Sequence, residues 1–378
     1  MQMYLAYLIL LTVQAILFSR NMPVPCSEGG RIVIKKKDGT RFFLMLSCIE
    51  LIIFAGLRGH TIGADTVLYL DALKHYTGIS LAEVFTAPLV YPFDFEIGYF
   101  ILTKLCGFLH FSPTAFLFVL SILIYVPLFK YIYRNSSHPY ISVLTYFAFG
   151  FLSYSLGIFR QFIAIGIILS ALRFIEERKF WKYLIAVLFA MLFHLTAFIA
   201  LPLYFLVKIN WEKHFFIVVT MICEVILLIV GRSVIMLAVM LFPSYAGYIG
   251  GYYDLQGGSY LNLIFLNMVM LLFFYTNRHI PEKKDIKYNL VFAQLVIAIL
   301  LQCCAYHMAI FGRIVPYFSI SLLVAIPTII DRLSRNDRAL SLILKVGTCA
   351  VLVILTVQDL YQNGYVYPFY FFWEAIPK

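Results

Sequence analysis

Charged residues are scarce in this sequence. Of its 378 residues, 13% are Asp, Glu, Lys or Arg, whereas 62% are hydrophobic and 17% are aromatic. A soluble domain carries about 25% charged residues and is about half apolar, so this composition excludes an ordinary soluble domain. Apolar runs of roughly 17–25 residues, the length of a membrane-crossing helix, recur from end to end. The sequence therefore predicts an all-α, polytopic membrane protein with about 10–12 membrane segments.

Metal-binding and nucleotide-binding motifs are missing as well. The seven cysteines are scattered and form no Cys-x-x-Cys or Cys/His pattern of metal spacing. The eight histidines include no His-Glu-x-x-His pattern. We therefore expect no metal and no cofactor. The net charge of +10 does not indicate nucleic-acid binding, because most Lys and Arg residues lie in short loops between apolar spans. We expect membrane lipid, and no nucleic acid, as a partner of the chain.

The distribution of Lys and Arg predicts an orientation in the membrane. Loops 20–41, 278–287 and 331–338 are basic and should face the cytoplasm. Both termini then face outward. The outer parts of the chain are segments 58–113 and 243–260 and the tail 359–378.

No linker divides the sequence, so residues 1–378 are predicted to form a single polytopic membrane domain. Two stretches are ambiguous. Residues 97–111 are apolar but short, which is typical of an interfacial or partly inserted helix. Residues 183–207 form either one span or a re-entrant hairpin broken at His194.

Three arginines lie on the predicted outer side, each at the end of an apolar span: Arg58, Arg160 and Arg313. Basic residues favour the cytoplasmic side of a membrane protein, so orientation in the membrane does not explain arginines on the outer side. Arginine presents a planar fork of donors that suits phosphate oxygens, so these residues and Gln161 are candidate ligands of a pyrophosphate. The alternative is that each arginine anchors a helix end.

The candidates for acid–base work are Asp65, His194 and Glu96, in that order of preference. Asp65 lies beside glycines that permit close approach of a ligand, and Glu96 is at the far end of the same outer segment. His194 lies within apolar sequence, where an ionisable residue usually has a function. It could act as a base, as a hydrogen-bond donor, or as a core histidine bonded to a backbone carbonyl.

Aromatic residues gather in segments 243–260 and 361–373. By default they form an interfacial belt at the membrane surface. Tyr and Trp faces also stack on sugar rings, which makes these segments the candidate glycan platform. The predicted glycan contacts are Tyr69, Tyr99, Tyr252, Tyr253 and Asp254.

Several short motifs occur in the same order as in the EpsG family of bacterial exopolysaccharide proteins, and the chain resembles that family, which is itself similar to Wzy-type polymerases. The motifs are Gly56-Leu57-Arg58-Gly59, Ile62-Gly63-Ala64-Asp65-Thr66 with Tyr69, Glu96-Ile97-Gly98-Tyr99, Arg160-Gln161, Phe193-His194 and Gly312-Arg313-Ile314. The family often has Asn before its Ile-Arg-Gln stretch. This chain instead has Gly157-Ile158-Phe159, which leaves any role of that Asn unfilled.

The resemblance implies a membrane-embedded glycosyltransferase on the outer face of the bacterial cytoplasmic (inner) membrane. Such an enzyme polymerises oligosaccharide repeats linked to polyprenyl pyrophosphate, for example undecaprenyl pyrophosphate, in exopolysaccharide, capsule or O-antigen synthesis. The donor would be a growing glycan and the acceptor a single repeat, both lipid-linked. A GT-C-like fold and partners such as a flippase and a chain-length regulator are further expectations.

Two other functions stay open from the sequence. One is a transporter or flippase for lipid-linked oligosaccharides, although transporters often contain inverted repeats and no internal repeat is visible in this sequence. The other is a membrane O-acyltransferase that modifies polysaccharide. Each would use a polar site within membrane helices, so composition does not separate them from the polymerase.

Overall fold

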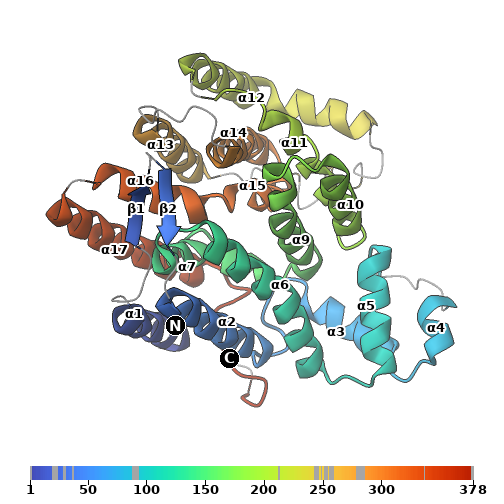
Figure 1. Cartoon of the computed structure of the whole chain (residues 1–378). Coiled ribbons are helices and arrows are strands. Elements are labelled where there is room, and N and C mark those ends of the chain that lie inside the picture. Colours follow the sequence, from blue (N-terminus) through green and yellow to red (C-terminus); the bar gives the residue numbers. More distant parts are fainter. Residues whose placement is uncertain are drawn as a thin grey trace. The chain divides into compact units, whose positions relative to one another are not determined.

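Long apolar helices dominate the computed structural model (Figure 1). Among the residues that the structure describes, six helices are long and apolar enough to cross a membrane, and a bent pair, Ala309–Ser319 with Leu322–Leu333, makes a seventh if it counts as one span. This confirms the predicted all-α, polytopic membrane fold. The structure describes residues 2–18, 24–28, 31–35, 38–86, 93–211, 213–241, 247, 249–250, 254, 259–277, 286–335 and 337–375.

The chain divides into two compact units, which we describe separately. The first unit contains residues 1–26, 33–201 and 342–378. Its elements are α1 (Gln2–Phe18), α2 (Asp38–Gly56), α3 (Thr66–His75), α4 (Leu81–Thr86), α5 (Ile97–Phe108), α6 (Pro113–Asn135), α7 (Pro139–Ala148), α8 (Phe151–Ser155), α9 (Phe159–Glu176), α10 (Phe180–Met191), the 3-10 helix η2 (Leu195–Ala200) and most of α17 (Arg338–Gln362).

The second unit contains residues 27–32 and 202–341. Its elements are α11 (Leu203–Leu206), α12 (His214–Leu241), α13 (Tyr260–Asn277), α14 (Ile286–His307), the 3-10 helix η5 (Ala309–Arg313), α15 (Pro316–Ser319) and α16 (Leu322–Leu333). Within this unit α14 packs against both α12 and α13.

The described part of the predicted cytoplasmic loop 20–41 contains regular structure. It contains a two-stranded sheet of β1 (Val24–Glu28) and β2 (Arg31–Lys35) and the start of α2. The second strand reads Arg-Ile-Val-Ile-Lys, and β-branched residues favour extended backbone. This sheet is the exception to helical structure among the described residues.

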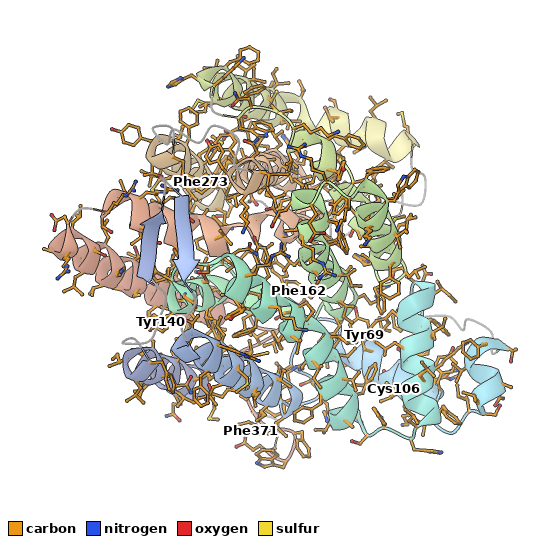
Figure 2. All side chains as sticks on the ribbon, in the orientation of Figure 1. Tyr69, Cys106, Tyr140, Phe162, Phe273 and Phe371 are labelled. Carbon is orange, nitrogen blue, oxygen red and sulfur yellow. The ribbon has the colours of Figure 1, made fainter. Side chains whose placement is uncertain are left out.

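Side-chain packing in the first unit is built around α6 and α9. Helix α6 packs against α2 on one side and α9 on the other, and α9 packs against α10. Phe162 of α9 is 3% exposed, and Figure 2 shows it among the side chains of the neighbouring helices. Helix α6 begins with a capped turn, because Ser112 Oγ accepts a hydrogen bond from the Ala115 amide at 3.2 Å and Pro113 follows it.

The stretch 183–207 is a hairpin broken at His194. Helix α10 ends at Met191, and His194 has extended backbone (φ −157°, ψ 120°) before η2 begins. The Tyr183 hydroxyl donates a hydrogen bond to the Ala200 carbonyl at 2.7 Å. A continuous helix would separate these two residues by about 25 Å along its axis, so the chain has turned back along α10.

A similar break occurs in the second unit. Met308 also has extended backbone (φ −152°, ψ 115°) between a long helix and a 3-10 helix. The His194 and Met308 amides each bond to the carbonyl four residues earlier, at 3.0 and 3.1 Å. Pro202 and Pro316 each stand eight residues after the break. The sequence shows no repeat, yet this local element is used twice, because backbone geometry tolerates different side chains.

Candidate functional site

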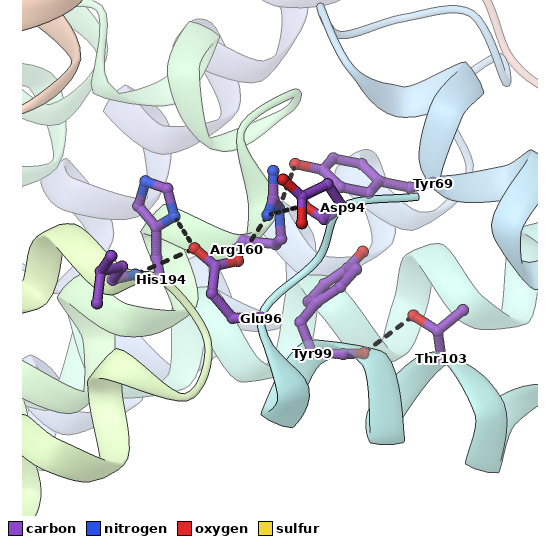
Figure 3. A network of polar contacts seen from close by, with 8 residues as sticks. Tyr69, Asp94, Glu96, Tyr99, Thr103, Arg160 and His194 are labelled. Atoms are coloured by element: carbon purple, nitrogen blue, oxygen red, sulfur yellow. Dashed lines mark hydrogen bonds and ion pairs between the residues drawn. The ribbon is translucent and has the colours of Figure 1, made fainter. Parts of the chain in front are cut away.

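Three separate segments of the first unit meet at the carboxylate of Glu96 (Figure 3). Its Oε2 atom accepts a hydrogen bond from Arg160 Nη1 at 2.5 Å. Its Oε1 atom accepts one from His194 Nδ1 at 2.7 Å and one from the Leu195 amide at 3.0 Å. The predicted pyrophosphate ligand Arg160 and the predicted base His194 are therefore joined through a third predicted residue.

The helix connections explain why Arg160 and His194 lie close together. Arg160 is in the first turn of α9, and His194 follows the end of α10. The two helices are joined by a tight turn in which Arg178 has a φ of +56°. Adjacent helices joined by a short turn run antiparallel, so the start of the first and the end of the second fall at the same level.

Glu96 reaches this level because a glycine follows it. Glu96 is the residue before α5, and the Gly98 amide donates a hydrogen bond to the Leu192 carbonyl at 2.8 Å. A Cβ atom at position 98 would stand 2.7 Å from that carbonyl oxygen, which is too close for a side chain. The Glu-x-Gly pattern therefore has a physical reason: the glycine lets the start of α5 approach the break at His194.

The Arg160 guanidinium is oriented by several contacts besides Glu96. Nε donates to the Tyr69 hydroxyl at 3.4 Å, and Nη1 also donates to the Asp94 carbonyl at 3.2 Å. The guanidinium carbon lies 4.9 Å from the centre of the Phe95 ring, within range of a cation–π interaction. None of these contacts uses Nη2, and the side chain is 20% exposed. Arg160 is thus held in one position while keeping donor capacity for a ligand.

The ionisation state of the Glu96 carboxyl group determines which nitrogen of His194 carries the proton. Burial alone would raise the pKa of Glu96, but the hydrogen bond from His194 and the charge of Arg160 outweigh it and lower the pKa to about 2. Glu96 is then an ionised, acceptor-only group at neutral pH, so His194 Nδ1 must be the donor. In the neutral ring Nε2 is consequently the free acceptor, and the side chain is 23% exposed. A histidine held by a carboxylate in this way can act as a base.

This arrangement predicts a loss of stability in acid. The pKa of Glu96 is lower in the folded protein than its ordinary value of 4.5, so its stabilisation is complete above pH 4.5 and is lost as the pH falls toward 2. The full effect is on the order of 3 kcal/mol. We expect the apparent Tm of the detergent-solubilised protein to fall across this range, and to fall less in Glu96→Gln. Asp71→Asn, at an exposed acid of the same outer segment, is the matched control. Its apparent Tm should fall as much as that of the natural protein.

Arg58 has a different environment from Arg160. It is 1% exposed, and its guanidinium donates to the backbone carbonyls of Ala55, Ile62 and Leu156, the last at 2.9 Å. Burial lowers the pKa of Arg58 to about 10, so it stays charged at neutral pH. These contacts favour a structural role for Arg58, and its predicted contact with pyrophosphate stays a prediction.

The other predicted residues of the first unit surround the cluster. Tyr69, Tyr99 and Gln161 are all at most 2% exposed, so none presents a face for a sugar in this structure. The Tyr69 hydroxyl instead orients Arg160. Asp65 is half-buried just before α3, one helical turn from Tyr69. Asp65 is therefore near the cluster.

The remaining predicted residues belong to the second unit. Arg313 is half-buried at the end of η5. Asp254 accepts two hydrogen bonds from Arg232, at 3.0 and 3.1 Å, and one from the Gly250 amide, so its first role here is to pair an arginine of α12. Tyr252 and Tyr253 lie outside the described residues. In the part of the chain that the structure describes, no group of three His, Cys, Asp or Glu residues could hold a metal ion.

Two groups in the cluster were not found from the sequence. They are the Asp94 carbonyl, which accepts from Arg160, and the Leu195 amide, which donates to Glu96. Every residue except proline carries the same backbone donor and acceptor, so no sequence pattern distinguishes these two. A partial signal existed for Leu195, because it follows the predicted break.

The fold and the site define a multi-pass α-helical membrane protein with a polar cluster at the ends of its helices. The model of the EpsG family matches residues 41–371, nearly the whole chain, so the protein belongs to the EpsG family. No curated protein and no solved structure is similar enough to this chain to count as a match. Membership of this family supports a role in polysaccharide biosynthesis.

Proposed function

We propose that this protein polymerises oligosaccharide repeats carried on polyprenyl pyrophosphate, at the outer face of the cytoplasmic membrane. One observation carries the proposal: a single carboxylate, Glu96, holds an arginine on one oxygen and a histidine on the other. The arginine suits a phosphate leaving group and the histidine suits a hydroxyl nucleophile. Family membership in polysaccharide biosynthesis supplies the class of substrate.

The proposed reaction forms a bond between an acceptor sugar oxygen and the anomeric carbon of the donor. The bond from that carbon to the pyrophosphate oxygen breaks, and the lipid pyrophosphate leaves with the electron pair. The proton of the acceptor hydroxyl moves to His194 Nε2. Arg160 donates hydrogen bonds to the departing phosphate, and these bonds stabilise the negative charge that develops on it. Atoms and charge balance without an added cofactor.

The charges of the cluster fit this reaction. Arg160 and Glu96 together carry no net charge, so the cluster is neutral when His194 is in the neutral form that the proposed reaction requires. When His194 accepts the proton it becomes positive while negative charge builds on the leaving pyrophosphate. The ionised Glu96 stabilises the imidazolium, as a carboxylate does in other histidine-based sites. The favourable interactions therefore increase toward the transition state, which is the requirement for catalysis.

The proposed location follows from the Lys and Arg distribution. Loops 20–41, 278–287 and 331–338 are basic and are assigned to the cytoplasm. The cluster lies at the start of α9. The Arg134–Glu176 ion pair lies at the other end of α9, next to the last turn of α6. A donor that is already lipid-linked needs no nucleotide at that outer face. Asp65 stays a candidate base, and Arg313 stays a candidate ligand of pyrophosphate.

The test is extension of purified lipid-linked repeats by the protein in liposomes. We expect a ladder of longer glycans and release of polyprenyl pyrophosphate. Translocation of the repeats without extension would support the flippase alternative. Transfer of acetyl groups without extension would support the O-acyltransferase alternative. Either of these two outcomes contradicts the proposal.

A further inference from the structure

The C-terminal tail lies antiparallel to the loop that carries Arg58 and is hydrogen-bonded to it. The Gly59 amide donates to the Tyr370 carbonyl at 2.8 Å, and the Phe372 amide donates to the Leu57 carbonyl at 3.0 Å. Arg58 and Phe371 form an antiparallel bridge between these two bonds. Figure 2 labels Phe371, which lies next to α2 in this unit. About 310 residues separate the two paired segments in the sequence, yet their backbones are hydrogen-bonded.

The same loop is joined to the start of α9 on its other side. The Arg58 guanidinium donates to the Leu156 carbonyl, and its carbon lies 5.1 Å from the centre of the Phe159 ring. The Thr66 hydroxyl also lies 3.2 Å from the Leu156 carbonyl oxygen. Phe159 is the first residue of α9 and Arg160 is the second. The loop therefore contacts the chain immediately before the arginine of the candidate site.

Two glycines make this close contact sterically possible. Gly63 has a φ of +105°, and a Cβ atom there would overlap the Leu156 carbonyl. A Cβ atom at Gly157 would stand 2.5 Å from the Ala64 amide nitrogen. The tail joins in at the same point, because the Gly63 amide donates to the Tyr365 carbonyl at 2.7 Å. Loop 57–66, residues 156–159 and the tail thus form one hydrogen-bonded layer.

We propose that Arg58 and the tail segment 365–372, together called the clamp, position Arg160 for the reaction. Arg58 is then a positioning residue that acts through the Leu156 carbonyl and Phe159, and it does not bind the substrate. The inference rests on the proposed function for the role of Arg160. According to this inference, the reaction requires the C-terminal tail, although the tail lies far from Arg160 in sequence.

The physical basis is the precision that a leaving-group contact requires. A displacement of about 1 Å at a catalytic group can cost about 10²-fold in rate. Arg160 lies in the first turn of α9, where helix hydrogen bonding is incomplete, so its position depends on the residues before the helix. Those residues are held from one side by hydrogen bonds to Leu152 and Tyr154 of α8, and from the other by the clamp, through the Leu156 carbonyl and the Phe159 ring. Weakening the clamp should therefore move Arg160 without removing any group that touches the substrate.

The first test uses Gly59→Ala, which introduces no functional group. A Cβ atom at this position would overlap the Tyr370 ring and push the tail away from the loop. We expect kcat for glycan extension to fall about tenfold or more, while KM for the lipid-linked donor changes less than about threefold. The matched control is Gly364→Ala in the same tail, where a Cβ atom meets nothing within 4 Å. Its kcat should equal that of the natural protein.

The second test separates positioning from substrate binding with Arg58→Lys. Lysine keeps the charge but has one nitrogen, so it cannot reach three carbonyls at once. The clamp predicts a lower kcat with an unchanged KM for the donor. A raised KM with an unchanged kcat would identify Arg58 as a pyrophosphate ligand and overturn the proposal. A specific activity per folded molecule equal to the natural protein's would leave Arg58 structural only and would overturn it as well.

Hydrogen exchange supplies a measurement that does not depend on activity. In the detergent-solubilised full chain, the amides of residues 157–162 should exchange faster in Gly59→Ala than in the natural protein, and at the natural rate in Gly364→Ala. Unchanged exchange in Gly59→Ala contradicts the clamp. If the natural protein extends no glycan, the proposed function fails, but this measurement still decides whether the clamp holds the start of α9.

Discussion

Replacing His194 with Gln should lower the rate of glycan extension by about 10²–10⁴-fold at equal protein abundance, the usual contribution of a general base. The reason is geometric. His194 Nδ1 is bonded to the ionised Glu96 at 2.7 Å, which leaves Nε2 as the acceptor for a hydroxyl proton. Glutamine offers an amide that has no comparable basicity. The measurement is the initial rate of extension in liposomes with purified lipid-linked repeats.

Two further variants make this prediction specific. His75→Gln alters an exposed histidine on α3 and should extend glycans at close to the natural rate. Asp65→Asn should lose less than about tenfold, because a carboxylate that only helps to orient a substrate contributes less than the base itself. The sequence alone placed Asp65 first and His194 second. If Asp65→Asn abolishes extension while His194→Gln extends normally, that original order is correct and Asp65 is the base.

Replacing Arg160 with Lys should lower extension by roughly 10²-fold or more, although the positive charge is kept. The guanidinium bonds at once to the Tyr69 hydroxyl, the Asp94 carbonyl and Glu96, and still has Nη2 to offer. A lysine nitrogen cannot make these three contacts and also bind a phosphate. The lost interaction belongs to the leaving group, so we expect the effect in kcat as well as in kcat/KM.

The matched control for Arg160 is Arg173→Lys at the other end of the same helix. Arg173 is exposed and lies over the Phe174 ring, away from the cluster. The Arg173→Lys variant should extend glycans at the natural rate. Normal extension by Arg160→Lys, at natural abundance in the membrane, would reduce Arg160 to a helix-end anchor and remove the leaving-group part of the mechanism.

The candidate site illustrates how arginines with similar sequence contexts separate in the structure. Arg58 and Arg160 both stand at ends of apolar spans. Arg58 is 1% exposed, and its guanidinium donates hydrogen bonds to three backbone carbonyls. Arg160 is 20% exposed and is paired to a carboxylate. Only the second arrangement combines partial exposure with a guanidinium nitrogen, Nη2, that these contacts do not use. Burial, rather than residue type, therefore decides which arginine can bind a phosphate.

Composition and motif order by themselves determined the class of this protein. A chain with 13% charged residues and repeated apolar runs has too few polar groups to fold in water, so a helical membrane protein followed directly. The ordered motifs identified the EpsG family and selected Glu96, Arg160 and His194 as residues of interest. The break at His194 was one of two alternatives for 183–207. Lys208 and Lys213 favoured it, because an ordinary span would place both lysines on the outer side.

The tertiary structure alone decided how these residues are connected. It placed Glu96 between Arg160 and His194, gave Arg58 to backbone carbonyls, buried Tyr69 and Tyr99, and paired the C-terminal tail with loop 57–66. The contacts of Glu96, the bond from Arg58 to the Leu156 carbonyl and the pairing of the tail join residues that lie about 60 to more than 300 positions apart. Local patterns report propensity and burial along one segment, but a contact at such a separation forms only when the packing of whole helices fixes both partners.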